Sequence, residues 1–424
     1  MSITREHACA MDANDPLATL REQFVLPEGV IYLDGNSLGA LPRATASRVQ
    51  SVMADEWGQQ LIASWNTAGW IDLPRSVGDR IARLLGVGAG EVVVADSTSV
   101  NLFKVLSAAL RIAQHDSRRR VIVSERSNFP TDLYIAQSLA QQFDCELRLL
   151  DADTLAQGID SEVAVVMLTH VNYRTGAMHD MGALSRKAHA VGALTVWDLA
   201  HSAGAVPLAL KEDAADFAIG CGYKYLNGGP GAPAFVWVHP QWVDQFQQPL
   251  SGWMGHAAPF AFDPQYAPAS GTSRYLCGTP AVIAMAALEC GVESVLAAET
   301  YGGMAAIRAK SLALTELFAE CVSKFAKGYG LRLVSPHEAN RRGSQISLTC
   351  EEGAYAIVQA LIARGVIGDF RAGDGVAMPD ILRFGFAPLY TRFVDAWDAA
   401  THLHEVLQSG NWREARFAAR HAVT

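Results

Sequence analysis

The sequence has few charged residues, no long apolar run and no closely spaced pair of cysteines. Charged residues make up 18% of the 424 residues and hydrophobic residues make up 50%. This composition is typical of a well-packed globular protein and not of a disordered chain. The formal net charge of -9 argues against a general nucleic-acid binder, which needs a basic face. The length favours a large domain with a smaller domain appended.

The seven cysteines are scattered from Cys9 to Cys350 without a CxxC motif. This usage indicates a reducing compartment and gives no sign of a disulfide framework or a zinc motif. No apolar run reaches the roughly 18 residues that a membrane helix needs, and the first 25 residues lack the apolar centre of a signal peptide. We therefore expect a cytoplasmic protein with no membrane segment and no nucleic-acid partner. His402 and His404 lie two apart on an expected helix and face different directions, so we expect no metal site.

Short β-branched runs alternate with helical patterns through the middle of the chain. The apolar runs predict buried strands at 120–125, 163–171, 194–201 and 215–222. Between them, apolar residues at helical spacing predict helices, for example at 132–143 and 181–192. This alternation predicts an α/β fold with a mostly parallel central sheet covered by helices.

The pattern changes after about Pro280. A long helical stretch, roughly Val282 to Phe325, is followed by strand-like runs at 331–335, 344–350 and 381–387. We expect a smaller α+β domain over 291–424, a large domain over 36–290 and an N-terminal segment over 1–35.

The ends of the predicted strands carry polar residues, and ligands of open α/β sheets bind at the carboxyl ends of strands. Ser97, Thr98 and Ser99 precede a helical pattern, where hydroxyls and free backbone N–H groups suit a phosphate. A simple helix cap is the alternative for each of them.

Pro130 and Asp132 open the next expected helix with ordinary capping chemistry. The aromatic Phe129, just before them, could stack on a flat ring.

Asp198 and Lys224 are the two charges that stand out at later strand ends. Asp198 ends an apolar run, three residues before His201, and a buried carboxylate needs a cation or a capping role. Lys224 lies 26 residues further on, before a glycine-rich turn. Removal from water lowers a lysine pKa and frees the amine for a Schiff base, although a lone lysine can also lay its stem along an apolar surface.

A phosphate site, a stacking aromatic, an in-strand aspartate and a lysine are together the parts that bind pyridoxal 5'-phosphate. The cofactor needs a Schiff-base lysine, an acidic partner for its ring nitrogen and an anion site for its phosphate. Each part alone is a weak signal, and the combination in this order is a strong one.

The motifs that carry these residues resemble fold-type-I pyridoxal-phosphate enzymes of the class V aminotransferase-like group, and in particular the kynureninase family. They are YLDGNSLGALP (32–42), STSVNLFK (97–104), NFPTDLY (128–134), WDLAHSAGAVP (197–207), GCGYKYLNGGPG (220–231), GWMGH (252–256) and LRFGFAPLY (382–390). The resemblance covers most of the chain and implies an aspartate-aminotransferase-like fold.

The resemblance also implies residue roles. Lys224 would bind the cofactor covalently and act as the acid and base at the substrate α carbon, with Tyr223 and Asp198 as the other catalytic residues. The implied cofactor-binding set is Thr98, Ser99, Phe129, Pro130, Thr131, Asp132, Thr169, Asp198, His201, Tyr223, Lys224, Trp253 and Thr279. Arg383 would bind the substrate α-carboxylate, and Asn36 and Trp70 would also contact the substrate. The family further implies a homodimer with active sites at the interface.

Kynureninases hydrolyse L-kynurenine to anthranilate and L-alanine in tryptophan catabolism, on a route to NAD, and 3-hydroxykynurenine is a second possible substrate. A class V aminotransferase or a cysteine desulfurase-like lyase is the alternative on the same fold, and Cys277 is the cysteine that a desulfurase could use. A cofactor-free serine hydrolase does not fit, because no GxSxG motif is followed by Asp and His in order. A non-catalytic protein is disfavoured by the presence of both Lys224 and Asp198.

Overall fold

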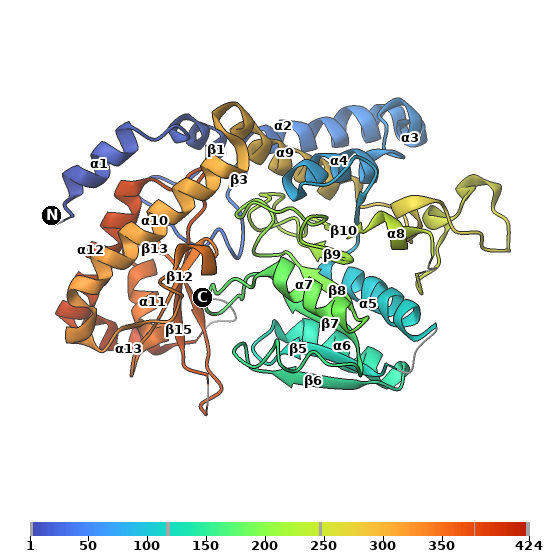
Figure 1. Cartoon of the computed structure of the whole chain (residues 1–424). Coiled ribbons are helices and arrows are strands. Elements are labelled where there is room, and N and C mark those ends of the chain that lie inside the picture. The colour runs from blue at the N-terminus through green and yellow to red at the C-terminus, as the bar shows by residue number, and fades with distance from the viewer. Residues whose placement is uncertain (1–2, 116–118, 246–247, 377, 421–424) are drawn as a thin grey trace.

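A seven-stranded sheet forms the centre of the larger part of the molecule (Figure 1). The computed structural model describes residues 3–115, 119–245, 248–376 and 378–420. The strands follow the order β4 (Val92–Ala95), β10 (Ala234–Val238), β9 (Phe217–Gly220), β8 (Leu194–Asp198), β7 (Val163–Thr169), β5 (Val121–Glu125) and β6 (Glu146–Leu150). Strands β5 to β9 pair in parallel, and β10 runs antiparallel to both β9 and β4. The prediction of a mostly parallel α/β sheet is therefore confirmed.

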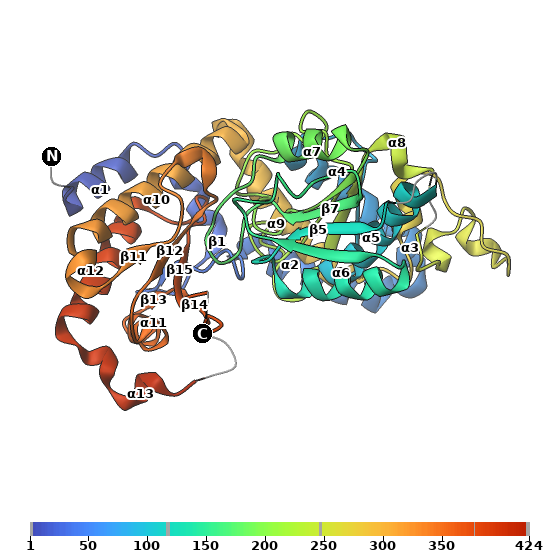
Figure 2. The same ribbon diagram turned by 60° about the horizontal axis from the view of Figure 1, so that its bottom comes forward.

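Helices cover both faces of this sheet because its strands are apolar on both sides. Along β4, Val92 and Val94 face one hydrophobic cluster and Val93 and Ala95 face another, as the two-residue period of a strand requires. The first cluster includes residues of α4 (Leu73–Leu85), α7 (Met181–Ala190) and α9 (Val282–Leu296). The second includes residues of α5 (Thr98–His115) and α6 (Pro130–Gln142), and Figure 2 shows these helices on either side of the sheet.

The smaller part of the molecule is built on a four-stranded antiparallel sheet. Its order is β11 (Arg332–Leu333), β12 (Gln345–Thr349), β15 (Ile381–Gly385) and β14 (Asp369–Arg371). Its helices are α10 (Gly303–Ala326), α11 (Ala354–Ile362), α12 (Phe393–Ser409) and α13 (Ala415–Ala418), and α1 (Arg5–Ala13) packs against α12. A third hydrophobic cluster joins these elements.

The long helix expected from Val282 to Phe325 is wrong in one respect, because it is two helices. Helix α9 ends at Leu296, a 3₁₀ turn spans Ala297–Tyr301, and α10 begins at Gly303. Gly302 has a φ of 101°, a conformation that glycine adopts without steric cost, so the chain turns there.

The segment from residue 31 to residue 39 links the two parts. Strand β2 (Ile31–Tyr32) pairs in parallel with β13 (Val366–Ile367). The Leu33 N–H donates to the Ile367 carbonyl at 2.8 Å, and the Gly39 N–H donates to the Tyr223 carbonyl at 2.8 Å. The Gly385 N–H of β15 donates to the Leu33 carbonyl at 2.6 Å, so this segment reaches from the small sheet to the loop that carries Lys224.

The remaining elements are short or peripheral. They are β1 (Phe24–Val25), β3 (Leu41–Pro42), α2 (Arg43–Ser51), a π-helix (Val52–Gln60), α3 (Ser64–Thr67), α8 (Pro240–Val243) and 3₁₀ turns at Ala18–Gln23, Leu61–Ala63, Trp253–Gly255, Pro259–Ala261, Gly271–Tyr275, Lys327–Tyr329, Ala339–Arg341 and Asn411–Arg413. Among the helices of the described ranges, none has the length and apolar character to cross a lipid bilayer.

Candidate active site

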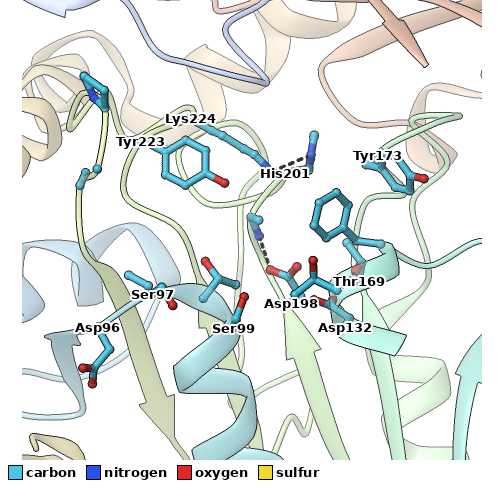
Figure 3. A pocket seen from close by; sticks show the side chains of 18 residues that line it. Asp96, Ser97, Ser99, Asp132, Thr169, Tyr173, Asp198, His201, Tyr223 and Lys224 are labelled. Atoms are coloured by element: carbon cyan, nitrogen blue, oxygen red, sulfur yellow. Dashed lines mark hydrogen bonds between the residues drawn. The ribbon is translucent and has the colours of Figure 1, made fainter. Parts of the chain in front are cut away.

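A cavity of about 430 Å³ lies where β7 and β8 end and where α5 and α6 begin (Figure 3). It is lined by Asp96, Ser97, Thr98, Ser99, Phe129, Thr131, Asp132, Thr169, Tyr173, Asp198, Ala200, His201, Tyr223, Lys224, Pro230, Gly231, Ala232 and Ala234. Ten of the predicted cofactor-binding residues are brought together here: Thr98, Ser99, Phe129, Thr131, Asp132, Thr169, Asp198, His201, Tyr223 and Lys224. Their places follow from the parallel sheet, whose strand ends meet at one edge.

The hydroxyl-rich turn before α5 forms one wall of the cavity. Ser97 takes the capping role, since its Oγ accepts the Val100 N–H at 3.3 Å. Thr98 and Ser99 lie in the first turn of α5 and line the cavity, and the first N–H groups of a helix have no partner within the helix. An anion is therefore favoured at this wall.

Lys104 stabilises the turn before α5. Its side chain is fully buried on α5 and pairs with the Asp96 carboxylate, and its Nζ donates to the Tyr275 carbonyl at 2.6 Å. Asp96 has a φ of 47°, which is uncommon for a residue other than glycine. The Lys104 pairing holds the turn in that conformation.

Two carboxyl groups, those of Asp132 and Asp198, share the floor of the cavity, and Figure 3 shows them close together. The Asp198 Oδ1 accepts the Ala200 N–H at 2.8 Å, and the Thr169 hydroxyl lies 3.3 Å from Asp132 Oδ2. Burial raises the pKa of both groups, and the negative charge of Asp198 raises the pKa of Asp132 further. A protonated Asp132 that donates to Asp198 satisfies this pair, and a cationic ring nitrogen would be stabilised beside it.

Lys224 and His201 form the opposite side of the site. The Lys224 Nζ lies 3.0 Å from His201 Nε2. Burial, and then the charge of Lys224, lowers the pKa of His201 well below its usual value. A neutral His201 can accept a hydrogen bond from the lysine. Its other nitrogen, Nδ1, is buried and has no hydrogen-bond partner among the described residues.

Aromatic side chains frame the space between these groups. Phe129 is 41% exposed and meets Tyr173 edge to face, with ring centroids 5.2 Å apart. The Lys224 Nζ lies 5.7 Å from the centre of the Tyr223 ring, and burial raises the pKa of the Tyr223 hydroxyl. Pro130 does not line the cavity. It is the first residue of α6, where it sets the chain direction after Phe129.

This donor set fits pyridoxal 5'-phosphate. The cavity offers a flat aromatic face, a carboxylate pair for a ring nitrogen, a helix start for a phosphate and an amine for a Schiff base. The unsatisfied Nδ1 of His201 is a polar atom that a bound polar group could satisfy.

Besides Pro130, five predicted residues lie outside the cavity. Arg383 and Asn36 lie in a polar cluster between the two parts, where the Arg383 guanidinium pairs with Asp369. The Asn36 amide, with its oxygen turned toward Arg383, lies 3.2 Å from Arg383 Nε.

The other three are Trp70, Trp253 and Thr279, which lie beyond the lining of this cavity. Trp253 packs on Trp65, with ring centroids 6.4 Å apart. Trp70 and Thr279 both line a second, apolar cavity of about 820 Å³.

Sequence reasoning missed Tyr173, Asp96, Lys104 and Asp369. Tyr173 and Asp96 follow strands β7 and β4. The rule that ligands bind at the carboxyl ends of strands could therefore have found them. Asp369 lies on β14 opposite Arg383 of β15, and only the strand register reveals that pairing.

The two histidines discussed above have separate partners. His402 Nδ1 accepts Arg364 Nε at 3.1 Å, and His404 stacks on Phe325 with ring centroids 4.5 Å apart. Within the part of the chain that the structure describes, no group of three or more His, Cys, Asp or Glu residues could hold a metal ion.

Fold and cavity together define a fold-type-I pyridoxal-phosphate enzyme. The fold is similar to that of the cysteine desulfurase from Thermococcus onnurineus NA1 (TM-score 0.75, 19% identity, 92% of this chain and 98% of that one). It is equally similar to the cysteine desulfurase CsdA from Escherichia coli (TM-score 0.75, 20% identity, 93% and 98%). At such identities the likeness concerns the fold alone.

Sequence similarity places the chain more narrowly. It is 57% identical over 425 residues to the kynureninase of Pseudomonas fluorescens, covering 99% of this chain and 100% of that one. It is 58% identical over 426 residues to the kynureninase of Burkholderia pseudomallei strain K96243, with the same coverage. The family model of the kynureninase C-terminal domain matches residues 307–403. The chain belongs to the kynureninase family.

The positions of the cysteines bear on the desulfurase alternative. Cys277 is part-buried and does not line the cavity, and among the described residues no cysteine does. A desulfurase needs a cysteine that reaches the cofactor, so the site as it stands does not favour that activity.

Proposed function

We propose that this protein hydrolyses L-kynurenine to anthranilate and L-alanine, with pyridoxal 5'-phosphate bound through Lys224. The observation that carries the proposal is the Lys224–His201 contact opposite the Asp132–Asp198 pair in one cavity. When bound, the cofactor supplies an electron sink for the charge that develops at the substrate α carbon. The family membership supports the substrate class.

The residues of the cavity divide the work. Lys224 removes the proton from the α carbon and later returns one, and neutral His201 holds the amine in place through the 3.0 Å contact. Asp198 would hold the ring nitrogen of the cofactor in its protonated form, and Phe129 would bind the flat ring. Tyr223 binds the phosphate and donates a proton during cleavage.

The phosphate and the substrate have further partners. Thr98 and Ser99 bind the phosphate at the start of α5, and Thr131, Asp132 and Thr169 complete the cofactor wall, with Pro130 directing the chain into it at the start of α6. Arg383 binds the substrate α-carboxylate, for which a planar guanidinium suits a bidentate contact. Asn36 and Trp70 contribute to the substrate pocket.

The proposal extends to a homodimer in the cytoplasm whose active sites lie at the interface. Trp253 and Thr279 belong to the predicted cofactor set but lie outside the cavity of their own chain, which supports a contribution to the site of a second copy. Apolar side chains around them are exposed, such as Phe260 at 57%, which packs on Trp253, and Trp57 at 56%, which lines the second cavity with Thr279. A patch of this kind is typical of an interface.

We also propose a place in tryptophan catabolism, and 3-hydroxykynurenine as a second substrate whose product feeds NAD biosynthesis. Steady-state assays of both substrates, following the fluorescence of anthranilate and of 3-hydroxyanthranilate, would rank them by kcat/KM. If the protein cleaves neither substrate faster than the buffer blank does, the proposed function is contradicted.

Cofactor attachment is tested separately. The purified protein should absorb in the visible range, and borohydride reduction followed by peptide mapping should place the cofactor on Lys224. Lys211→Ala is the matched control, since Lys211 pairs with Glu91 at the surface and its loss should leave the colour unchanged. A protein that stays colourless with added cofactor would overturn the assignment.

Subunit exchange tests the interface. Lys224→Ala and Trp253→Ala each lose activity alone, and mixing them after mild denaturation should restore part of it, because one hybrid site carries both native residues. No recovery on mixing would show that Trp253 serves its own chain.

A further inference from the structure

A cluster of two arginines and two carboxylates lies between the small sheet and the segment around residue 36. Asp369 of β14 is the central group, since its Oδ2 pairs with Arg383 Nη2 and lies 2.6 Å from Arg371 Nη2. Ser37 Oγ lies 3.1 Å from the same oxygen. Asp34 is the second carboxylate, 3.9 Å from Arg383.

Arg383 has partners for each of its three nitrogens. Its Nη1 donates to the Tyr173 carbonyl at 2.8 Å, and its Nη2 donates to Ser37 Oγ at 2.7 Å as well as to Asp369. Its Nε lies 3.2 Å from the terminal amide of Asn36, whose oxygen accepts it when the amide is turned toward Arg383. The side chain is 1% exposed. A bidentate contact to a substrate carboxylate therefore requires that Asp369 first leave this guanidinium.

Arg371 is less constrained than Arg383. Its side chain is 36% exposed, and its buried Nε has no hydrogen-bond partner among the described residues. It already contacts Asp369 through Nη2. Burial and the nearby charge of Arg383 lower its pKa, so its cationic form gains from an anion of its own.

We propose that Asp369 is an exchangeable occupant of the substrate-carboxylate site. It pairs with both Arg383 and Arg371 while the site is empty, and it keeps Arg371 when the α-carboxylate of an amino acid takes its place on Arg383. The inference rests on the proposed function in one respect, namely that Arg383 binds the α-carboxylate. Asp369 is thus a positioning residue that sets how strongly the enzyme captures its substrate.

Charge balance gives the physical reason for such an exchange. A buried guanidinium without an anion is costly, and so is a buried carboxylate without a cation. In the empty site Arg383 and Arg371 share the Asp369 carboxylate, and after the exchange each guanidinium has one anion of its own. Asp34 would leave one negative charge in excess, but burial and the charge of Asp369 raise the pKa of Asp34 to about 7, so it can take up a proton.

Two substitutions with opposite expected effects test the exchange. Asp369→Asn removes the competing anion and should lower the Kd of L-alanine by ~10-fold, whereas Arg371→Gln leaves Asp369 on Arg383 and should raise it by ~10-fold. The probe is L-alanine, titrated into the holoenzyme and followed by the absorption of the bound cofactor. A purely structural role would weaken binding in both variants.

Asp395→Asn is the matched control. Asp395 is also a buried carboxylate between two arginines, Arg21 at 3.2 Å and Arg392 at 2.6 Å, but it lies at the start of α12 and away from the cavity. This variant should leave the Kd unchanged. The Michaelis constant for L-kynurenine should follow the Kd shifts of the two test variants, with a smaller change in kcat.

The outcomes separate this inference from the proposed function. Opposite shifts of the L-alanine Kd support the exchange even when wild type releases no anthranilate, a result that would contradict only the proposed function. Shifts in the same direction, or none in either variant, would overturn the exchange even when L-kynurenine is cleaved. An unchanged Kd in Arg383→Lys would overturn it too, because Arg383 would then not bind the carboxylate.

Discussion

The molecule contains two pairs of buried carboxyl groups in contrasting surroundings. Among the described residues that line the cavity of the large part, Lys224 is the one cation that Asp132 and Asp198 face. Asp34 and Asp369 lie with two guanidinium groups at the edge of the small sheet. The first pair has fewer positive charges than carboxyl groups, and the second pair has as many.

This difference indicates what each pair is built to receive. A pair short of positive charge stabilises a cation, such as a protonated ring nitrogen, and keeps it protonated. A balanced pair cannot take another anion without moving a charge, so it suits a site in which one carboxylate replaces another. The first pair is therefore suited to the cationic ring nitrogen of the cofactor, and the second pair is suited to the carboxylate of the substrate.

Loss of Lys224 should have the largest effect, because the site opposite the first pair then has no amine. We expect Lys224→Ala to reduce kcat for L-kynurenine by ~10³-fold or more, with a circular dichroism spectrum like that of wild type. Anthranilate release at a rate near that of wild type would remove Lys224 from the mechanism.

The two members of the first pair should respond unequally. Asp198→Asn removes the carboxylate that keeps the ring nitrogen protonated and should lower kcat by ~10²-fold. Asp132→Asn should retain most activity, because an amide resembles the protonated carboxyl in charge and shape. Both kcat values are measured with saturating cofactor. An equal loss in both variants would mean that the two groups share one role.

Arg383→Lys removes a guanidinium that pairs with the second carboxyl pair and keeps the positive charge at this position. The planar fork of arginine binds a carboxylate bidentately and a lysine does not, so we expect the KM for L-kynurenine to rise by ~10-fold or more. Cofactor affinity, measured by absorption titration of the apoenzyme, should change little. A KM equal to that of wild type would place the carboxylate contact elsewhere.

Asp34→Asn should have the smallest effect, and it depends on pH. Burial, together with the negative charge of Asp369, raises the pKa of Asp34 to about 7 from an ordinary value of 3.8. Between these values the folded chain keeps a proton that the unfolded chain has lost, so this group makes the protein less stable as pH rises. The Asn variant has no such proton.

The Tm of Asp34→Asn relative to wild type should therefore increase from about pH 4 to about pH 7 and then level off. Asp398→Asn is the control, since it removes a carboxylate that pairs with Arg5 at the surface. A Tm difference that is constant across this range would show that Asp34 ionises normally in the folded state.

The sequence could predict the large sheet and most of the cavity because both depend on local pattern. Apolar runs predict strands, and in a parallel sheet the residues after each strand meet at one edge, which is why Asp198 and Lys224 could be paired in advance. The break at Gly302 was missed because helical spacing continues on both sides of it. The partner of Arg383 was missed because contact with Asp369 depends on the register of two strands.

Trp253 and Thr279 show a different limit. The family motif includes them in the cofactor site, yet neither lines the cavity of its own chain. Sequence similarity carries no information on whether a motif residue serves its own chain or a second copy. That assignment stays a prediction until the subunit-exchange experiment is done.

The hydrogen bond from Gly39 to the Tyr223 carbonyl gives the protein a built-in reporter. An added Cβ at Gly39 would lie 2.4 Å from the Lys224 carbonyl oxygen, so this close approach needs glycine. Movement of the 31–39 segment away from the Lys224 loop breaks this bond and exposes the Gly39 amide to solvent. Its deuterium uptake therefore measures how often this segment leaves the loop, and a bound amino acid that holds the segment in place should slow it.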